Sequence, residues 1–294
     1  MIRSIHAAYF EAGADIVSTN TFGCAPYVLA EYGLAERAYE ITLAAGRLAR
    51  EVAGGRFVVG AMGPSTRSIS VTRNVTFDEV RDAYALQAAA LIAGGVDALL
   101  LETAQDTLNV KAAALGVRAA MREAGVDLPL MVSGTIEPMG TMLAGQGVEA
   151  LYVALEHLDL FSIGLNCATG PEFMTDHLRS LAAMSTRYVS VYPNAGLPDE
   201  RGQYAETPAS LAFKMKRFVD EGWVQLRRRL LRNDAGPHPG AAGAGGRPRP
   251  ARSGERGSPQ AVSGIEVFYP ADDNRPLFVG ETHQRDRLAA VQGS

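Results

Sequence analysis

Six apolar segments recur between residues 14 and 196, and each of them ends in small or polar residues. Their near-continuous hydrophobicity is typical of strands that are covered on both faces, as in a parallel sheet. Segments with helical periodicity separate them. The six predicted strands are "ADIVSTN" (14–20), "RFVVGAMGP" (56–64), "VDALLLET" (96–103), "LPLMVSGTI" (128–136), "LDLFSIGLNC" (158–167) and "RYVSVYPNAG" (187–196).

The alternation of strands and helices predicts a βα repeat and therefore an α/β fold. One intervening helix is marked at both ends, since Thr76 and Glu79 form a capping box at its start and Gly94-Gly95 closes it. Units of about 30 to 40 residues fit either a (β/α) barrel or a doubly wound sheet. In both architectures the chemistry gathers at the carboxyl ends of the strands.

The strand ends together offer carboxylates, a thiol and amides, a set of groups that suits a small-molecule site. No glycine-rich phosphate loop follows the first predicted strand, and the histidines lie away from the strand ends. The sequence therefore indicates neither a nucleotide-phosphate site nor a Ser-His or Cys-His pair. The strand-end residues are Asn20, Thr21, Met62, Gly63, Pro64, Glu102, Thr103, Ser133 to Glu137, Asn166, Cys167 and Asn194.

Composition changes abruptly at residue 225. Residues 225–260 are crowded with Arg, Gly and Pro and nearly lack β-branched and aromatic side chains, so they cannot bury enough apolar surface to offset their chain entropy. We therefore predict three parts. These are a folded βα domain over 1–224, a disordered segment over 225–260, and a linker remnant over 261–294.

Several general features limit the location and the partners of the chain. It contains two cysteines, Cys24 and Cys167, and no secretory signal pattern, which favours the reducing cytoplasm. Its apolar runs are far shorter than the ~20 residues that a membrane span requires. The formal net charge of -4 offers no electrostatic reason to bind nucleic acid. We expect a cytoplasmic protein with neither a membrane nor a nucleic acid as partner.

Five stretches at and beside the strand ends carry a family resemblance. They are "GADIVSTNTFG", "LLLETAQDTLNVKAA", "VSGTIEPMGTMLAGQ", "GLNCATGPEFM" and "VYPNAGLP". Together they resemble the homocysteine-binding (homocysteine S-methyltransferase) domain of cobalamin-dependent methionine synthase, over almost all of 1–224. The resemblance implies a TIM-type (β/α)8 barrel. The family's first strand has no counterpart here and its last falls in the altered segment, so we expect an incomplete barrel with strands 1 and 8 missing or scrambled.

The same resemblance implies a function, cofactors and site residues. Family members methylate homocysteine, whose sulfur is kept a thiolate by a zinc ion on three cysteinates. The methyl group comes from methylcobalamin, and ultimately from methyltetrahydrofolate, on other domains, so the expected partner is the cobalamin-binding domain of the full-length enzyme. By resemblance, Cys167 is the first zinc ligand, Glu102 contacts the homocysteine amino group, and Asn194 approaches the zinc when substrate is absent. Cys24 is interpreted as a packing or loop residue, and no residue is singled out as catalytic.

The adjacent cysteine pair that the family supplies from a "GGCCGT" turn is absent. Residues 225–239 can be encoded by codons chosen so that loss of the first base yields "NSVGGCCGTTPGHIR". The tail "THQRDRLAAVQG" similarly yields "RTNATGSRRFK", which resembles the start of a folate-binding domain. We therefore interpret the altered segment as a shifted reading frame, which also explains the Arg run 227–232 without nucleic-acid binding.

Three functions follow as alternatives. The first is a homocysteine S-methyltransferase module, and the second is an inactive remnant of that enzyme lacking two zinc ligands. The third is an unrelated βα-barrel lyase, which a Schiff-base lysine at a strand end would favour, and none of the six predicted strands ends in one. The first two alternatives can be told apart by zinc content, because the active module would bind zinc and the inactive remnant would not.

Overall fold

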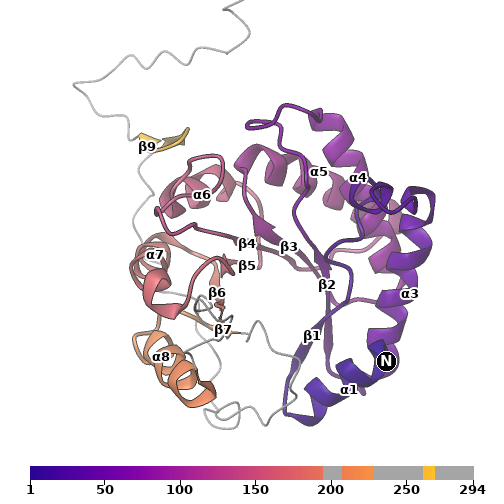
Figure 1. The fold of residues 1–294 in the computed structure, drawn as a ribbon, viewed down its shortest axis with the longest axis horizontal. Helices are drawn as coiled ribbons and strands as arrows, with labels where there is room; N and C mark the ends of the chain where they lie inside the picture. The colour runs from indigo at the N-terminus through magenta and orange to yellow at the C-terminus, as the bar shows by residue number, and fades with distance from the viewer. Residues whose placement is uncertain (195–206, 228–260, 269–294) are drawn as a thin grey trace, which may run out of the picture.

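The computed structural model describes residues 1–194, 207–227 and 261–268. Seven parallel strands form one sheet in the chain order β1-β2-β3-β4-β5-β6-β7. Figure 1 shows this sheet curling inside a ring of helices. The strands are β1 (Ile16–Ser18), β2 (Phe57–Met62), β3 (Ala98–Ala104), β4 (Leu130–Gly134), β5 (Ser162–Asn166), β6 (Tyr188–Tyr192) and β7 (Leu226–Arg227).

The helices lie on the outer face of the curled sheet (Figure 1). Because β1 and β7 stand at the two ends of the strand order, the barrel is incomplete over the described residues. The predicted α/β fold and incomplete TIM-type barrel are thus confirmed. The helices are α1 (Ile2–Glu11), α2 (Pro26–Ala30), the short 3-10 helix η1 (Ala35–Arg37), α3 (Ala38–Glu51), α4 (Phe77–Ala93), α5 (Thr107–Ala124), α6 (Val148–Leu155), α7 (Pro171–Met184) and α8 (Pro208–Asp220).

Each of the six predicted strands overlaps one observed strand, and only β3 runs past its predicted end, by one residue to Ala104, whereas β7 was not predicted. Its two residues lie just beyond the predicted boundary at 224, and they pair with Ser190 and Val191 of β6. The rest of the segment predicted to be disordered, 228–260, lies outside the described residues, as does 269–294. Contacts with β6 therefore extend the sheet past the point at which the composition changes.

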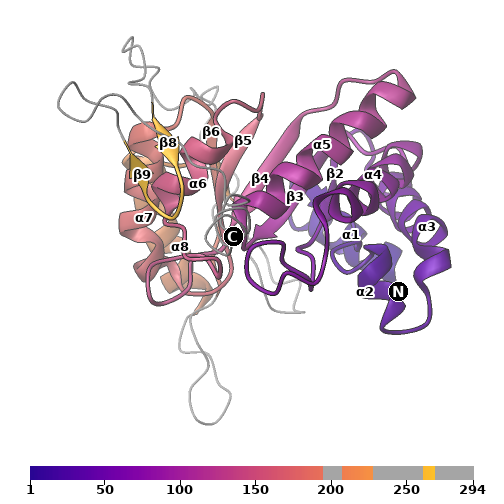
Figure 2. The ribbon, with the colours of Figure 1, turned by 90° about the horizontal axis from the view of Figure 1, so that it is seen from above.

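Residues 261–268 form a small antiparallel hairpin of β8 (Val262–Ser263) and β9 (Val267–Phe268). Both strands contact α6, and Figure 2 shows the hairpin beside that helix. Ala261 and Val267 pack against the main hydrophobic core. The start of the predicted linker remnant is therefore docked on the barrel.

Strand alternation sorts the side chains of the sheet into two sets. One set faces the helices and belongs to the large core cluster, which includes Leu99, Val132 and Ile163. The other set faces the barrel interior, which we call the lumen. A small lumen cluster consists of Val59, Ala98, Leu100, Met131 and Tyr192, with Leu226 packed against it.

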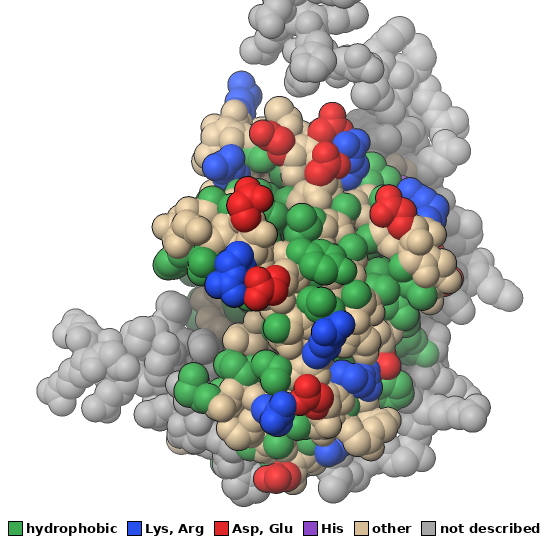
Figure 3. Space-filling model, turned by 90° about the vertical axis from the view of Figure 1, so that its right-hand side faces the viewer, with side chains coloured by type: hydrophobic (Ala, Val, Ile, Leu, Met, Phe, Trp, Pro, Cys, Tyr) green, Lys and Arg blue, Asp and Glu red, His purple; other side chains and the backbone are tan. Residues whose placement is uncertain are grey.

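Charged side chains of both signs are interspersed on the side of the barrel that carries α3 and α4 (Figure 3). Exposed ion pairs form on these elements, including Arg81 with Asp78 in α4 and Arg37 of η1 with Glu40 of α3. Exposed pairs of this kind contribute about 0 to 1 kcal/mol each, so the fold depends on its core rather than on this surface. None of the described helices is both long and apolar enough to cross a membrane.

The predicted capping box at the start of α4 is present. The Thr76 hydroxyl accepts from the Glu79 backbone N–H at 3.2 Å, and the Thr76 backbone N–H donates to the Glu79 carboxylate at 2.7 Å. This backbone hydrogen bond, followed by one from the Thr76 hydroxyl, lowers the pKa of Glu79. The folded state thus retains the charged carboxylate at lower pH than the unfolded chain does.

Glu79→Gln is expected to remove a pH-dependent contribution to stability. A lowered folded pKa means that this contribution is complete above the ordinary glutamate pKa of ~4.3 and is lost as the pH falls through the lowered value. The difference in urea midpoint between the native chain and the variant should therefore be constant near neutral pH and shrink on acidification. A difference that stays constant through the acid range would contradict this account.

Candidate functional site

The Asn166 side chain is the centre of a hydrogen-bond network at the carboxyl ends of β3, β4 and β5. Its Nδ2 donates to the Thr103 hydroxyl at 2.7 Å. Its Oδ1 accepts from the Ser133 hydroxyl at 2.7 Å and from the Thr103 backbone N–H at 3.1 Å. All three residues are buried. This strand-end network, Thr103, Ser133 and Asn166, therefore ties three adjacent strands together where a barrel holds its chemistry.

Cys167 follows this network directly and is half-buried. The Asn166 Nδ2 also donates to the Cys167 sulfur at 3.0 Å, and the Cys167 backbone N–H donates to the Tyr192 carbonyl of β6 at 3.0 Å. Cys167 has a φ of +58°, and Ala168 has a φ of +52°. Both residues therefore adopt the left-handed conformation that residues with a β-carbon rarely take.

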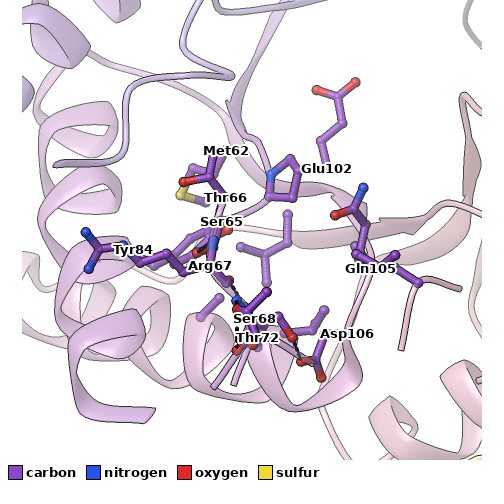
Figure 4. Close-up of a pocket in the computed structure, with 17 residues that line it drawn as sticks. Met62, Ser65, Thr66, Arg67, Ser68, Thr72, Tyr84, Glu102, Gln105 and Asp106 are labelled. Carbon is purple, nitrogen blue, oxygen red and sulfur yellow. Dashed lines mark hydrogen bonds between the residues drawn. The ribbon is translucent and has the colours of Figure 1, made fainter. Parts of the chain in front are cut away.

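Glu102 lies near the end of β3 and is 5% exposed. The register between β3 and β4 shifts between Leu101 and Ala104, and Thr103 there has a φ of +64°. Such irregularities re-aim side chains next to functional sites. Figure 4 shows the Glu102 carboxylate pointing away from Asp106 and Ser68.

Asn194 follows β6 and stands at the edge of the described segment. Its backbone N–H donates to the Thr169 carbonyl at 3.3 Å, and the Thr169 N–H donates in turn to the Cys167 carbonyl at 2.6 Å. The Asn194 Oδ1 is buried and has no hydrogen-bond partner among the described residues. The three predicted site residues, Glu102, Cys167 and Asn194, are thus brought to one edge of the sheet by a continuous series of short contacts.

A cavity of about 120 Å³ lies between β3, the start of α5 and the loop after β2 (Figure 4). Asp106 caps α5 by accepting from the Leu108 N–H at 2.9 Å, and it also accepts from the Ser68 hydroxyl at 2.6 Å and the Ser70 N–H at 3.0 Å. The cavity is smaller than the ~300 to 1,000 Å³ of ordinary ligand pockets. The Asp106 contacts therefore anchor a loop beside the site.

Several features of this region were not predicted. The anchoring role of Asp106 was missed, although an Asp directly before a helix is an N-cap signal. Thr21 was predicted as a strand-end site residue, yet its hydroxyl donates to the Ala61 carbonyl at 2.6 Å and so ties the segment after β1 to β2. Tyr84 was not predicted either. Its hydroxyl donates to the Gly63 carbonyl at 2.6 Å, and burial raises its pKa well above the ordinary value.

The residues present do not fit a zinc site made of three cysteinates. The whole chain has two cysteines, and the described residues contain no group of three His, Cys, Asp or Glu side chains that could hold a metal ion. Cys24 lies after β1, is 7% exposed, and has a pKa that burial raises. Buried thiols of this kind are inert packing residues. Cys167 therefore stands as the single candidate thiolate at the strand-end edge.

Comparisons with known proteins agree on one family. A family model described as homocysteine S-methyltransferase matches residues 1–226. The chain is 42% identical over 236 residues, 77% of its length, to the methionine synthases of Mycobacterium leprae (strain TN) and Mycobacterium tuberculosis (strain ATCC 25618 / H37Rv). It spans 20% of the length of each of these relatives.

Solved structures show the same fold. The homocysteine methyltransferase MmuM from Escherichia coli in its oxidized form matches with a TM-score of 0.64 and 21% identity, over 78% of each chain. Its metallated form matches with a TM-score of 0.59 and 23% identity, over 73% of this chain and 83% of that one.

Proposed function

Since the chain belongs to the homocysteine S-methyltransferase family, we propose that it is the homocysteine-binding module of a methionine-synthase-type methyltransferase. The observation that carries this proposal is the meeting of Glu102 and Cys167 at one edge of the sheet, where Asn166 bonds to Thr103 on one side and to the Cys167 sulfur on the other. Homocysteine has an ammonium group at one end and a thiol at the other. The Glu102 carboxylate offers a partner for the ammonium group, and Cys167 would lie beside the sulfur as a ligand of the zinc ion that binds it.

In this proposal Glu102 binds the substrate ammonium group. The carboxylate is 5% exposed, and a charge-assisted hydrogen bond in such a place is roughly twice as strong as a neutral one. Cys167 lies beside the sulfur end of the substrate, and Asn194 offers to the same region an Oδ1 that has no hydrogen-bond partner among the described residues. These are the roles that the family resemblance implies.

We propose that the methyl donor is held elsewhere. Methylcobalamin, charged from methyltetrahydrofolate, would be presented by other domains of a full-length cytoplasmic enzyme, and the cobalamin-binding domain would be the partner of this module. The length of the mycobacterial relatives supports this, because this chain spans 20% of each.

Zinc would turn the substrate thiol, with an ordinary pKa of roughly 8.5, into a thiolate near neutral pH. Cys167 would be its first ligand, but this chain supplies one cysteinate where catalytic zinc sites need three protein ligands. The second candidate function is therefore an inactive form of the enzyme, and the cysteine count favours it for this chain. The domain boundaries that go with it are 1–224 for the module, 225–260 for a shifted-frame segment and 261–294 for a linker remnant.

Glu102→Gln is expected to weaken homocysteine binding about tenfold or more, because the variant loses one charge-assisted hydrogen bond while its shape is retained. Binding is followed by NMR titration, which detects weak complexes, with zinc-free protein and with Glu156→Gln as an exposed control. The native chain and the control should show the same saturating shifts. If neither of them responds to homocysteine, or if the Glu102 variant binds as well as the native chain, the proposed function is wrong.

A further inference from the structure

One side chain links two left-handed turns at the strand-end edge. Asn166 is fully buried, and its amide makes contacts with Thr103, Ser133 and the Cys167 sulfur. Thr103, at φ +64°, directly follows Glu102, and Cys167, at φ +58°, directly follows Asn166. The Asn166 amide therefore contacts one left-handed residue at the end of β3 and another at the end of β5, where Ala168 continues the left-handed turn at φ +52°.

A left-handed conformation at a residue with a β-carbon is unfavourable and persists only where the surrounding structure holds it in place. For Thr103, the Asn166 side chain satisfies both the backbone N–H, at 3.1 Å, and the hydroxyl, at 2.7 Å. For Cys167, the same side chain contacts the sulfur at 3.0 Å while Tyr192 accepts from the backbone. One planar amide thus restrains both turns.

Other buried polar side chains in the lumen are less fully hydrogen-bonded than Asn166. Ser162 and Ser190 are also fully buried, yet their hydroxyl oxygens have no hydrogen-bond partner among the described residues. Within the part of the chain that the structure describes, the lumen therefore contains hydroxyls without a hydrogen-bond partner, although burying an unpaired polar group is costly. The full set of bonds around Asn166 is a local property of the strand-end edge rather than a general feature of the lumen.

We propose that Asn166 is a positioning residue, which sets the direction of the Glu102 carboxylate relative to the Cys167 thiol through the two turns that it restrains. This inference rests on the proposed function, because the two groups need a fixed spacing only if one ligand reaches both. Asn166 acts through the residues that it contacts, which are Thr103 beside Glu102 and Cys167 itself.

The test compares how fast iodoacetamide modifies the two cysteines in the native chain and in Asn166→Ala, read out by mass spectrometry. Rates are taken at a pH where they no longer rise, so that both thiols are ionised in every variant. Freeing the sulfur from the amide should speed modification of Cys167 about tenfold, the factor that corresponds to 1.4 kcal/mol. Cys24 is the internal reference, because it is buried in another part of the fold and reports general loosening.

Ser162→Ala is the matched control. Ser162 lies in β5 like Asn166, and its buried hydroxyl has no hydrogen-bond partner among the described residues. Its ratio of Cys167 to Cys24 modification should equal that of the native chain. Ser133→Ala removes the hydroxyl that donates to Asn166 at 2.7 Å and accepts from the Thr103 backbone N–H at 3.4 Å, and it leaves the amide in place. It should therefore raise the ratio partly, and it serves if Asn166→Ala does not fold. Faster exchange of the Thr103 amide proton than of its β3 neighbours should accompany both changes.

An unchanged ratio in Asn166→Ala, or equal acceleration at the two cysteines, would overturn the inference and leave Asn166 as an ordinary core residue. The outcome is separable from that of the proposed function. Modification rates need no substrate, whereas the homocysteine titration of the native chain tests the function alone. If Asn166→Ala selectively speeds modification of Cys167 but the native chain does not bind homocysteine, then Asn166 restrains the two turns, but it does not position them for homocysteine.

Discussion

Replacing residues 225–239 by "NSVGGCCGTTPGHIR" is expected to produce a chain that binds one zinc ion, whereas the present chain retains none after dialysis. The replacement adds two cysteinates to the one that Cys167 supplies, which completes the number of protein ligands usual in catalytic zinc sites. Cysteine-rich zinc sites bind with about 10 to 16 kcal/mol in small domains, so the loss of two thiolates removes most of the affinity. Zinc per chain is measured by elemental mass spectrometry.

The matched control for this replacement carries serines at both added cysteine positions. It preserves the length and the neighbouring residues while removing the two thiolates. Equal zinc in the two replaced chains, or stoichiometric zinc in the present chain, would refute the assignment of Cys167 as one of three ligands. Methylation of homocysteine, with methylcobalamin supplied, should follow the zinc content and be absent from the present chain.

Gly164→Ala is expected to destabilise the barrel by about 3 kcal/mol, the upper part of the range for overpacked cores. A β-carbon at this position of β5 would lie 2.1 Å from both the carbonyl oxygen and the hydroxyl of Ser190 on β6. The hydroxyl can rotate away, but the carbonyl moves only with its strand. The two strands would therefore have to separate.

This separation should also reach the candidate site. Asn166 pairs with Tyr192 two residues further along the same two strands, and the Tyr192 carbonyl accepts from the Cys167 backbone. Stability is measured by urea unfolding, with Ser162→Ala as the control in the same strand. A Gly164 variant whose free energy of unfolding lies within about 0.5 kcal/mol of the native value, the usual effect of a surface substitution, would show that the spacing of β5 and β6 is not limiting.

The local features of the fold could be read from the sequence because they depend on near neighbours. Alternating apolar and helical periods predicted six strands in the right places, and "TFDE" predicted the capping box that Thr76 and Glu79 form. Each of these depends on contacts within a few residues. Glu102, Cys167 and Asn194 could be proposed for the same reason, since each stands at the end of a recognisable strand.

Other features required contacts between distant segments. No local pattern marks β7, whose two residues are strand-like because Ser190 and Val191 offer them partners. Nor does the sequence around Thr103 show that an amide 63 residues away holds it in a left-handed turn. The sequence by itself determined the repeat, the strand ends, the family and the lack of a cysteine pair. The tertiary structure alone decided the register, the strained turns and the central place of Asn166, because these depend on which strands lie side by side once the sheet has curled.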